Sequence, residues 1–594
     1  MQNARLTNFY LDYDIQDVTA AGNASFIQPT DQQSFTRVQN LTNKESMDIE
    51  FPRFTFEHNF NILDGSLQPL EVEGSVPITV PFFNATLSDE DGEYTSIPSI
   101  EINFSRTHSS FAFEFHFVDN HPIEMRMSFW DADGYLLDRF TTAVDKLTFI
   151  TYHDVYEYSR ILIEFTKTLP YRYVKLKYIK FGTTITWDET NVQNASLIQQ
   201  TDRLSKSLAI DTLSFTVIDV AGSLNLGNTN GMHRYFQRDQ VMYPYEIIQQ
   251  LNDDGEYETT KIYLGKYYLK TFSESSNLGK MTCQSYLGLM DDITFYGGAV
   301  YNGIKAGVVI DKIFEAMGYE NYEIDDETYN QLLYGTITPK SCRNALTDVL
   351  FATHSVIDSH NLDYVDIKKS TLIKRPDLLK VNKFSTSTKK NDYIYGVDVK
   401  YTMYTQETEA KEIAKGTYDA GTHTVYFTSP YTGMTINTGT IDSQSTYSIT
   451  FTISASAEVI ITGYGYTTTT SIAQATVDHL QAGETEKTTS YTTTLLNATQ
   501  AKELAEKILE YLSYDLTISV KFLADDNVMS DFHIVENPVD QFSNYYGMFT
   551  KRSLDLTGGF IDTATLVGST IYEPLLPYAR ESNYELHAGG TALI

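Results

Sequence analysis

The chain has 594 residues, more than the roughly 250–300 that one hydrophobic core supports, so about four folded units are expected. Its 77 acidic residues outnumber 44 basic ones, and a surface with the resulting formal charge of −33 repels phosphate backbones. The acidity is spread along a chain with 42% hydrophobic residues, so the composition excludes both a disordered chain and a nucleic-acid-binding protein held by charge.

The residue types favour strands. The chain contains 43 Tyr and 33 Phe, which are common in half-buried strands. Its 2 cysteines, Cys283 and Cys342, fall in different predicted units, so we expect free buried thiols and neither a disulfide framework nor a zinc site. The N-terminus lacks the apolar region of a signal peptide, and no stretch reaches the ~18 apolar residues of a membrane helix. We therefore expect no membrane-spanning segment, no metal and no cofactor.

Residues 1–185 form a series of short alternating segments, including RFTFEHNFNI, SFAFEFHFV and RILIEFT. Strict alternation of apolar and polar residues is typical of sheets with one wet face. Short strands at this spacing predict an N-terminal jelly roll or β-sandwich. Within FWDADGYLL (129–137), a hairpin turn at Asp133-Gly134 is favoured over a calcium loop, because an aromatic residue occupies the fifth loop position.

Three aromatic residues are candidates for stacking on sugar rings: Trp130 and Tyr135 within this region, and Trp187 just after it. The alternative is that they pack in the core or between domains. The sequence leaves both open.

The next units alternate between β and helical periods. Residues 186–300 predict a first β-barrel domain. Residues 301–385 predict a small α+β domain, because GIKAGVVIDKIFEAMG (303–318) places Ile304 and Phe314 on one helical face and TPKSCRNALTDVLFATHSV predicts a second helix capped by Ser341.

The last third of the chain predicts a second β-barrel domain that is interrupted by an insertion. Residues 386–410 and 490–572 form the barrel, with a helix in NATQAKELAEKILEYLSYD capped by Thr499 or Asn497, and residues 411–489, rich in Thr and Gly, form an inserted β module. Residues 573–594 remain as a C-terminal tail, too short for a catalytic domain.

The paired glycines in KRSLDLTGGFIDTATLVG (551–568) pose a choice between a phosphate loop and a turn. A phosphate loop must lead into a helix, but the residues after Gly559 are β-branched and alternate like a strand. We therefore predict that Gly558 and Gly559 form a type I′ hairpin turn, a structural role with no ligand.

No recognised catalytic motif occurs in the sequence. His354 beside Ser355 suggests a hydrolytic dyad, but neighbours on a helix point to different faces, so a capping or surface histidine is preferred. Carboxylate pairs are too frequent to identify a glycosidase site. The sequence therefore predicts no enzyme and no catalytic residues.

The order of these parts resembles the tail hub, or baseplate hub, proteins of bacteriophages and related contractile particles. The resemblance covers residues 186–572 and is carried by four segments in this order: YLGKYYLKTFSE, GIKAGVVIDKIFEAMG, TQAKELAEKILEYLSYDLTISVKF and GMFTKRSLDLTGGFIDTATLVG. The resemblance implies two hub-type β-barrel domains per subunit, and a homotrimer that pairs them into a pseudo-sixfold ring or cup.

Such a hub implies a structural role in the virion, assembled in the host cytoplasm. It joins the tail tube or distal tail protein to tail-tip, spike or receptor-binding proteins, and it leaves a channel for DNA or tape-measure protein during genome ejection. The strong negative charge of the chain suits that passage.

Residues 1–185 depart from the hub pattern. The segments MSFWDADGYLLDRF and LPYRYVKLKYIKFG are similar to galactose-binding-like jelly rolls. This similarity implies, as an alternative function, recognition of cell-surface carbohydrate as a receptor. A cell-wall-degrading enzyme is a third hypothesis that no group of residues supports.

Overall fold

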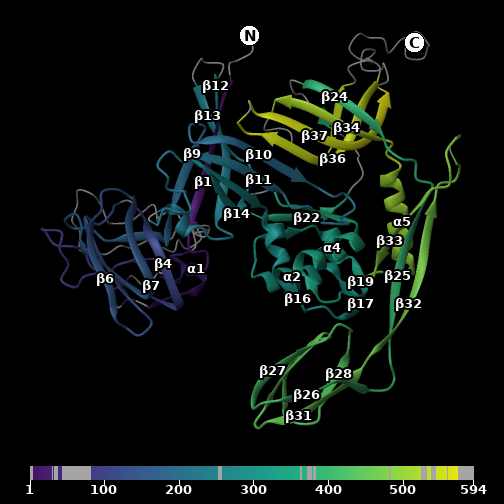
Figure 1. The fold of residues 1–594 in the computed structure, drawn as a ribbon, viewed down its shortest axis with the longest axis horizontal. Helices are drawn as coiled ribbons and strands as arrows, with labels where there is room; N and C mark the ends of the chain where they lie inside the picture. The colour runs from purple at the N-terminus through teal and green to yellow at the C-terminus, as the bar shows by residue number, and fades with distance from the viewer. Residues whose placement is uncertain are drawn as a thin grey trace, which may run out of the picture.

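The computed structural model shows a mainly β chain, as predicted (Figure 1). Besides several sheets, its described residues include three helices of at least 12 residues. The described residues are 5–27, 29, 31–32, 38–42, 82–118, 120–229, 231–251, 257–360, 364–370, 377–378, 383–480, 483–523, 532–536, 543–557 and 559–572.

The described residues of the N-terminal domain form one seven-stranded sheet that encloses its own core. β4 and β7 pair near both of their ends, but β5 extends the sheet beside residues 160–167 and β8 extends it beside residues 114–117. The sheet thus curves around a core that includes Phe113, Phe129 and Ile163. Its strands are β2 (Ala24–Ile27), β3 (Phe82–Phe83), β4 (Ser99–Phe117), β5 (Glu124–Trp130), β6 (Leu136–Ala143), β7 (Thr148–Lys167) and β8 (Lys175–Lys180), with α1 (Ala20–Asn23) and a 3₁₀ turn (Val38–Asn40) beside them.

The predicted jelly roll is not tested by these strands. The expected strand RFTFEHNFNI at 53–62 lies outside the described residues. The jelly roll therefore stays a prediction.

The first strand does not belong to the N-terminal domain, which corrects the predicted unit 1–185. β1 (Arg5–Gln16) pairs with β12 on one side and with β9 (Gly182–Asp188) on the other, both in the large sheet described below. Gly182 lies opposite Gln16, where a Cβ atom would be 2.0 Å from the Ile15 carbonyl oxygen, so only glycine permits this approach. The N-terminal domain is thus inserted between two neighbouring strands, and the predicted boundary at 185 falls inside β9. Alternation identifies the buried face of a strand but not the sheet to which it belongs.

The predicted pair of β-barrel units shares one 14-stranded sheet, whose main path is β24-β34-β37-β36-β10-β11-β15-β14-β12-β1-β9 (Figure 1). Two separate cores lie along it, one under the first unit and one under the second. The remaining strands of this sheet are β10 (Val192–Gln200), β11 (Thr212–Ile218), β12 (Val241–Leu251), β13 (Tyr257–Tyr263), β14 (Tyr267–Ser275), β15 (Leu278–Gln284), β23 (Asp377–Leu378), β24 (Lys383–Lys390), β34 (Leu516–Leu523), β35 (Phe532–Glu536), β36 (Ser543–Asp555) and β37 (Ile561–Tyr572).

The small α+β unit contains the helices that the sequence predicts. α2 (Ala306–Met317) ends at Gly318, which adopts a φ of +63°, and α4 (Cys342–Thr353) is capped by the Ser341 hydroxyl. Ile304, predicted on the helical face, lies instead on β17. The other elements are 3₁₀ turns at Met232–Tyr235 and Tyr286–Asp291, α3 (Asp326–Asn330), β16 (Thr294–Phe295), β17 (Val300–Lys305), β18 (Tyr322–Ile324), β19 (Leu332–Thr336), β20 (Lys340–Ser341), β21 (Ser355–Asp358) and β22 (Val365–Lys369).

The predicted division of the last third is wrong at two strands. β25 (Gly396–Gln406) and β33 (Thr488–Thr493) do not join the large sheet. Instead β25 is the central strand of a separate three-stranded sheet, in which it pairs with β33 on one side and on the other with β32 (Tyr466–Thr476), which the sequence assigns to the insertion. α5 (Ala498–Leu512), whose cap is Asn497, packs on this three-stranded sheet, and its buried face belongs to the core of the small unit.

The true insertion is a compact sandwich at the lower end of the molecule in Figure 1. Two three-stranded sheets, β26-β31-β28 and β27-β30-β29, enclose a core that includes Met434, Phe451 and Ile461. Its strands are β26 (Lys411–Tyr418), β27 (Gly421–Tyr426), β28 (Thr432–Ile436), β29 (Thr440–Gln444), β30 (Ser448–Ile453) and β31 (Ala457–Tyr464).

Candidate functional site: the joined sheet and its domain junctions

The two β units meet at a seam formed by β10 and β36. These strands pair antiparallel from Ser196 opposite Asp555 to Gln200 opposite Lys551, although more than 300 residues of chain separate them. Arg552 faces the interior of the seam, and its guanidinium donates to the Asp562 carboxylate on β37. The two side chains are only 7% and 0% exposed. Burial raises the pKa of Asp562, and the Arg552 guanidinium opposes this effect, so the carboxylate depends on Arg552 for its charge.

A loop after β10 attaches the small unit to the seam. Arg203 Nε donates to the Phe549 carbonyl oxygen of β36 at 2.9 Å, and Ser370 Oγ donates to the Arg203 carbonyl oxygen at 3.0 Å. Ser205 Oγ donates to the carbonyl oxygen of Ser355 at 2.6 Å. These contacts link both β units to the small unit through one short segment.

His360 forms a second link between the large sheet and the small unit. Its Nε2 lies 3.1 Å from Asp211 Oδ2, just before β11, and its Nδ1 lies 2.8 Å from Asp358 Oδ1, at the end of β21. Burial alone would lower the pKa of His360, but Asp211 and Asp358 outweigh it and raise the pKa to about 10. His360 hydrogen bonding likewise outweighs burial and lowers the pKa of Asp358. The imidazolium is therefore the stable form at neutral pH.

We expect this junction to weaken in alkali. Because the folded pKa of His360 lies above its ordinary value of 6.5, its stabilisation is complete below about pH 6.5 and is lost as the pH rises towards about 10. Denaturant unfolding of the chain at pH 6, 8 and 10 measures this loss, with His360→Gln as the comparison. The variant should show a smaller decrease between pH 6 and 10 than the parent chain, and equal slopes would contradict the assignment.

The N-terminal domain is fixed to the large sheet by a buried polar network. Lys180 Nζ, at the end of β8, donates to Asp14 Oδ1 of β1 at 2.9 Å and to Thr184 Oγ1 of β9 at 2.7 Å. Glu114 of β4 accepts a hydrogen bond from the Thr184 amide at 3.2 Å and lies 2.5 Å from His116 Nε2. Burial would raise the pKa of Glu114, but His116 and Lys180 outweigh it and lower the pKa to about 2. The network therefore holds opposite charges on both sides of the domain junction.

The structure separates the three aromatic candidates for sugar stacking. Trp187 is wrong as a candidate, because it is 7% exposed and packs against Tyr13 and Phe215 in the core of the large sheet. Trp130 and Tyr135 lie in the β5–β6 hairpin. The Arg160 guanidinium lies 3.9 Å from the centre of the Trp130 ring, whereas Tyr135 is 72% exposed. Their role in sugar binding stays a prediction.

Gly559 lies in the loop of the β36–β37 hairpin. Asp555 pairs with Ile561, so residues 556–560 form the loop, which is longer than the predicted two-residue type I′ turn. Gly559 has a φ of +92° and Phe560 a φ of +54°, whereas Gly558 lies outside the described residues. Leu556 donates its amide to the Ala195 carbonyl oxygen at 2.9 Å, so this loop closes one end of the seam. A strand follows it, not the helix that a phosphate loop requires.

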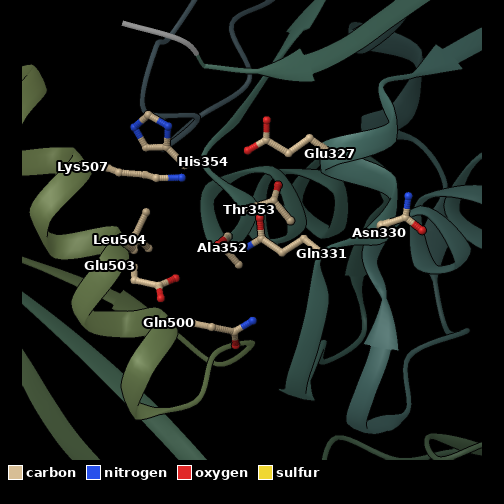
Figure 2. A pocket seen from close by; sticks show the side chains of 10 residues that line it. All are labelled: Glu327, Asn330, Gln331, Ala352, Thr353, His354, Gln500, Glu503, Leu504 and Lys507. Atoms are coloured by element: carbon tan, nitrogen blue, oxygen red, sulfur yellow. Dashed lines mark hydrogen bonds between the residues drawn. The ribbon is translucent and has the colours of Figure 1, made fainter.

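His354 and Ser355 do not act on each other. His354 is the buried C-cap residue of α4 with a φ of +51°, and Ser355 Oγ lies 2.9 Å from Thr328 Oγ1. Burial, and then the nearby Lys507 ammonium, lowers the pKa of His354 to about 4. The imidazole borders a polar pocket of about 400 Å³ between α3, α4 and α5, and Figure 2 shows Lys507 extending from α5 towards it.

Three further observations concern the described part of the chain. Within it, no group of three or more His, Cys, Asp or Glu side chains is placed to hold a metal ion. None of its helices is long and apolar enough to cross a membrane. The two cysteines are free and buried, as predicted.

Comparison with solved structures returns tail proteins of low sequence identity. No protein-family model matches the chain, and no curated protein is significantly similar to it in sequence. Among solved structures, a tail protein from Neisseria meningitidis MC58 is 10% identical and covers 64% of this chain and 93% of its own, with a TM-score of 0.38. The prophage tail protein gp18 from Listeria monocytogenes EGD-e is 8% identical and covers 68% and 97%, with a TM-score of 0.36.

A third similar structure is the Escherichia coli c3393 protein, a component of the type VI secretion system described as similar to bacteriophage T4 tail proteins gp27 and gp5. It is 7% identical, covers 64% of this chain and 76% of its own, and has a TM-score of 0.29. These structures are of the same class as the proteins that the sequence resembles.

Sequence reasoning missed the junction residues, although one signal for them was present. Arg552 shares its strand face with Leu554, and Asp562 shares its face with Ala564 and Leu566, all buried. A charged residue at an apolar position of two successive predicted strands indicates a buried cross-strand pair. No comparable pattern connects Lys180 with Asp14, which are 166 residues apart.

Proposed function

We propose that this chain is a structural tail hub protein. Three copies form a ring or cup at the tail tip, where they join the tail tube or distal tail protein to tail-tip, spike or receptor-binding proteins. The ring surrounds a channel for DNA or tape-measure protein during ejection. The protein acts in the virion after assembly in the host cytoplasm, and it has no catalytic role.

The observation that carries the proposal is the seam between β10 and β36. It joins two β units that are distant in sequence into one continuous sheet, as a ring with two such units per subunit requires. Arg203 and His360 then fix the small unit to the same sheet. Three copies would contribute six β units, which suits a transition between sixfold and threefold symmetry. The formal charge of −33 supports passage of DNA without strong binding.

Native mass spectrometry of the purified chain, alone and with its tail tube partner, tests the proposal. A mass of three chains is expected, and class averages from electron microscopy should show a ring with a central opening. A chain that stays monomeric under both conditions would contradict the trimeric hub.

A further inference from the structure

One face of the inserted sandwich is a regular array of hydroxyl groups. The strands β27, β30 and β29 lie side by side, and their outward positions carry Thr or Ser in two cross-strand rows. With strands about 4.8 Å apart and outward residues about 6.8 Å apart along each strand, these hydroxyls form a two-dimensional grid. We call it the hydroxyl face; its two rows are Thr422–Thr452–Thr440 and Thr424–Thr450–Ser443.

Four of the six hydroxyl groups are paired by hydrogen bonds across the strands. Thr422 Oγ1 lies 2.7 Å from Thr452 Oγ1, and Thr424 Oγ1 lies 2.9 Å from Thr450 Oγ1. Thr452 Oγ1 donates to Asp442 Oδ2 at 2.7 Å. Each hydroxyl has one donor and two acceptor positions, so these bonds orient the array and leave further capacity directed outwards.

The hydroxyl face is almost free of charge. The three strands read GTHTVY, TIDSQ and SITFTI, in which Asp442 is the one Asp, Glu, Lys or Arg, although such residues make up 20% of the chain. Exposed sheet faces usually carry charged side chains. Without a cation, this face has nothing to pair with a phosphate or carboxylate, and an apolar partner would leave its hydroxyls unsatisfied.

An exposed aromatic ring borders the same face. Tyr426 is the next outward residue of β27 after Thr424 and is 57% exposed. Its ring packs against Tyr296, with 4.3 Å between the ring centres, which fixes its position. An anchored tyrosine with an accessible surface suits stacking against the apolar side of a sugar ring.

We propose that the hydroxyl face and Tyr426 form a binding site for a neutral polysaccharide. The ligand's own hydroxyl groups donate to and accept from the threonine and serine grid, Asp442 accepts from a sugar hydroxyl, and one sugar ring stacks on Tyr426. The absence of cations selects an uncharged glycan over teichoic or phosphorylated polymers. This module lies at the end of the molecule opposite the β24–β34–β37–β36 sheet, a position accessible to a surface polymer (Figure 1). The site does not depend on the hub assignment.

Affinity electrophoresis of the full-length chain in gels that contain dextran, mannan, galactan or β-glucan tests the site, with heparin as the charged comparison. We expect retardation by at least one uncharged polymer and none by heparin. Tyr426→Ala and Thr424→Glu should each weaken that binding at least tenfold. The matched control is Thr435→Glu, because Thr435 is also exposed and pairs with Thr462 at 2.8 Å, but on the opposite sheet of the sandwich. Its binding should equal that of the parent chain.

Three outcomes would overturn the proposal: no retardation by any uncharged polymer, equal loss of binding in the control, or variants that change only the mass of the oligomer. The last result would mean that another copy of the chain covers the face. Melting temperatures of the variants, compared with the parent chain, separate lost binding from lost folding. Because the two test variants act on different side chains, misfolding of one leaves the other as the test.

Discussion

Replacing Asp562 with alanine is expected to lower the free energy of unfolding by about 3–5 kcal/mol. The carboxylate is fully buried at the seam, and its loss leaves the Arg552 guanidinium, itself 7% exposed, without its anion. Desolvation of that cation is then no longer offset by an opposite charge. Urea denaturation followed by tryptophan fluorescence measures the change, since Trp187 lies in the core of the same sheet.

The double variant Arg552→Met with Asp562→Leu is the control for this effect. It removes both charges and keeps apolar volume in the seam, so it should recover most of the stability that Asp562→Ala loses. A double variant as unstable as the single one would show that shape, not charge, determines stability at this position. Loss of trimers in Asp562→Ala, with recovery in the double variant, would also connect the seam to assembly.

Replacing Lys180 with methionine is expected to cost about 3–5 kcal/mol at pH 7 and clearly less at pH 4.5. Without the ammonium, the Asp14 and Glu114 carboxylates stay buried at the junction with fewer opposing charges. Lys180 is one of the groups that lower the pKa of Glu114 to about 2, so its removal raises that pKa. Mild acid then protonates more of the buried carboxylates, which reduces the repulsion between them and the cost of the substitution. Denaturant unfolding at the two pH values measures the difference.

Lys146→Met provides a matched comparison for the junction. Lys146 is an exposed lysine of the same domain, so its replacement should change stability by less than about 0.5 kcal/mol. Equal effects of the two substitutions, or an effect of Lys180→Met that does not decrease in acid, would contradict a charge-based junction.

Local patterns in the sequence predicted elements well, because the physical cause of each element is local. The caps of α4 and α5 follow from Ser341 and Asn497, whose side chains accept from backbone amides three residues later. Gly318 ends α2 in the left-handed region, as glycine favours. The inserted sandwich also has alternating strands, as its Thr-rich sequence suggests.

Strand partners were the part that the sequence could not determine. β1 and β25 alternate as clearly as their neighbours, yet each belongs to a sheet other than the predicted one. Alternation records which face is buried, whereas pairing depends on contacts between distant segments. For the same reason the sequence predicts Trp187 on a surface of the N-terminal domain, whereas Trp187 lies on β9 in the core of the large sheet. The seam and both junctions arise only from such long-range pairings.

The insertion of the N-terminal domain between β1 and β9 has a consequence for how the chain folds. The β9 partner of β1 lies more than 160 residues further along the chain. Closing so long a loop between two strands is slow and costs conformational entropy. The intervening domain has its own core, so it can form first and bring its two ends together. Gln16 and Gly182 then lie opposite each other, and a contact that is distant in sequence becomes a local hairpin closure. Prior folding of the inserted domain therefore lowers the entropy cost of pairing β1 with β9 at the edge of the large sheet.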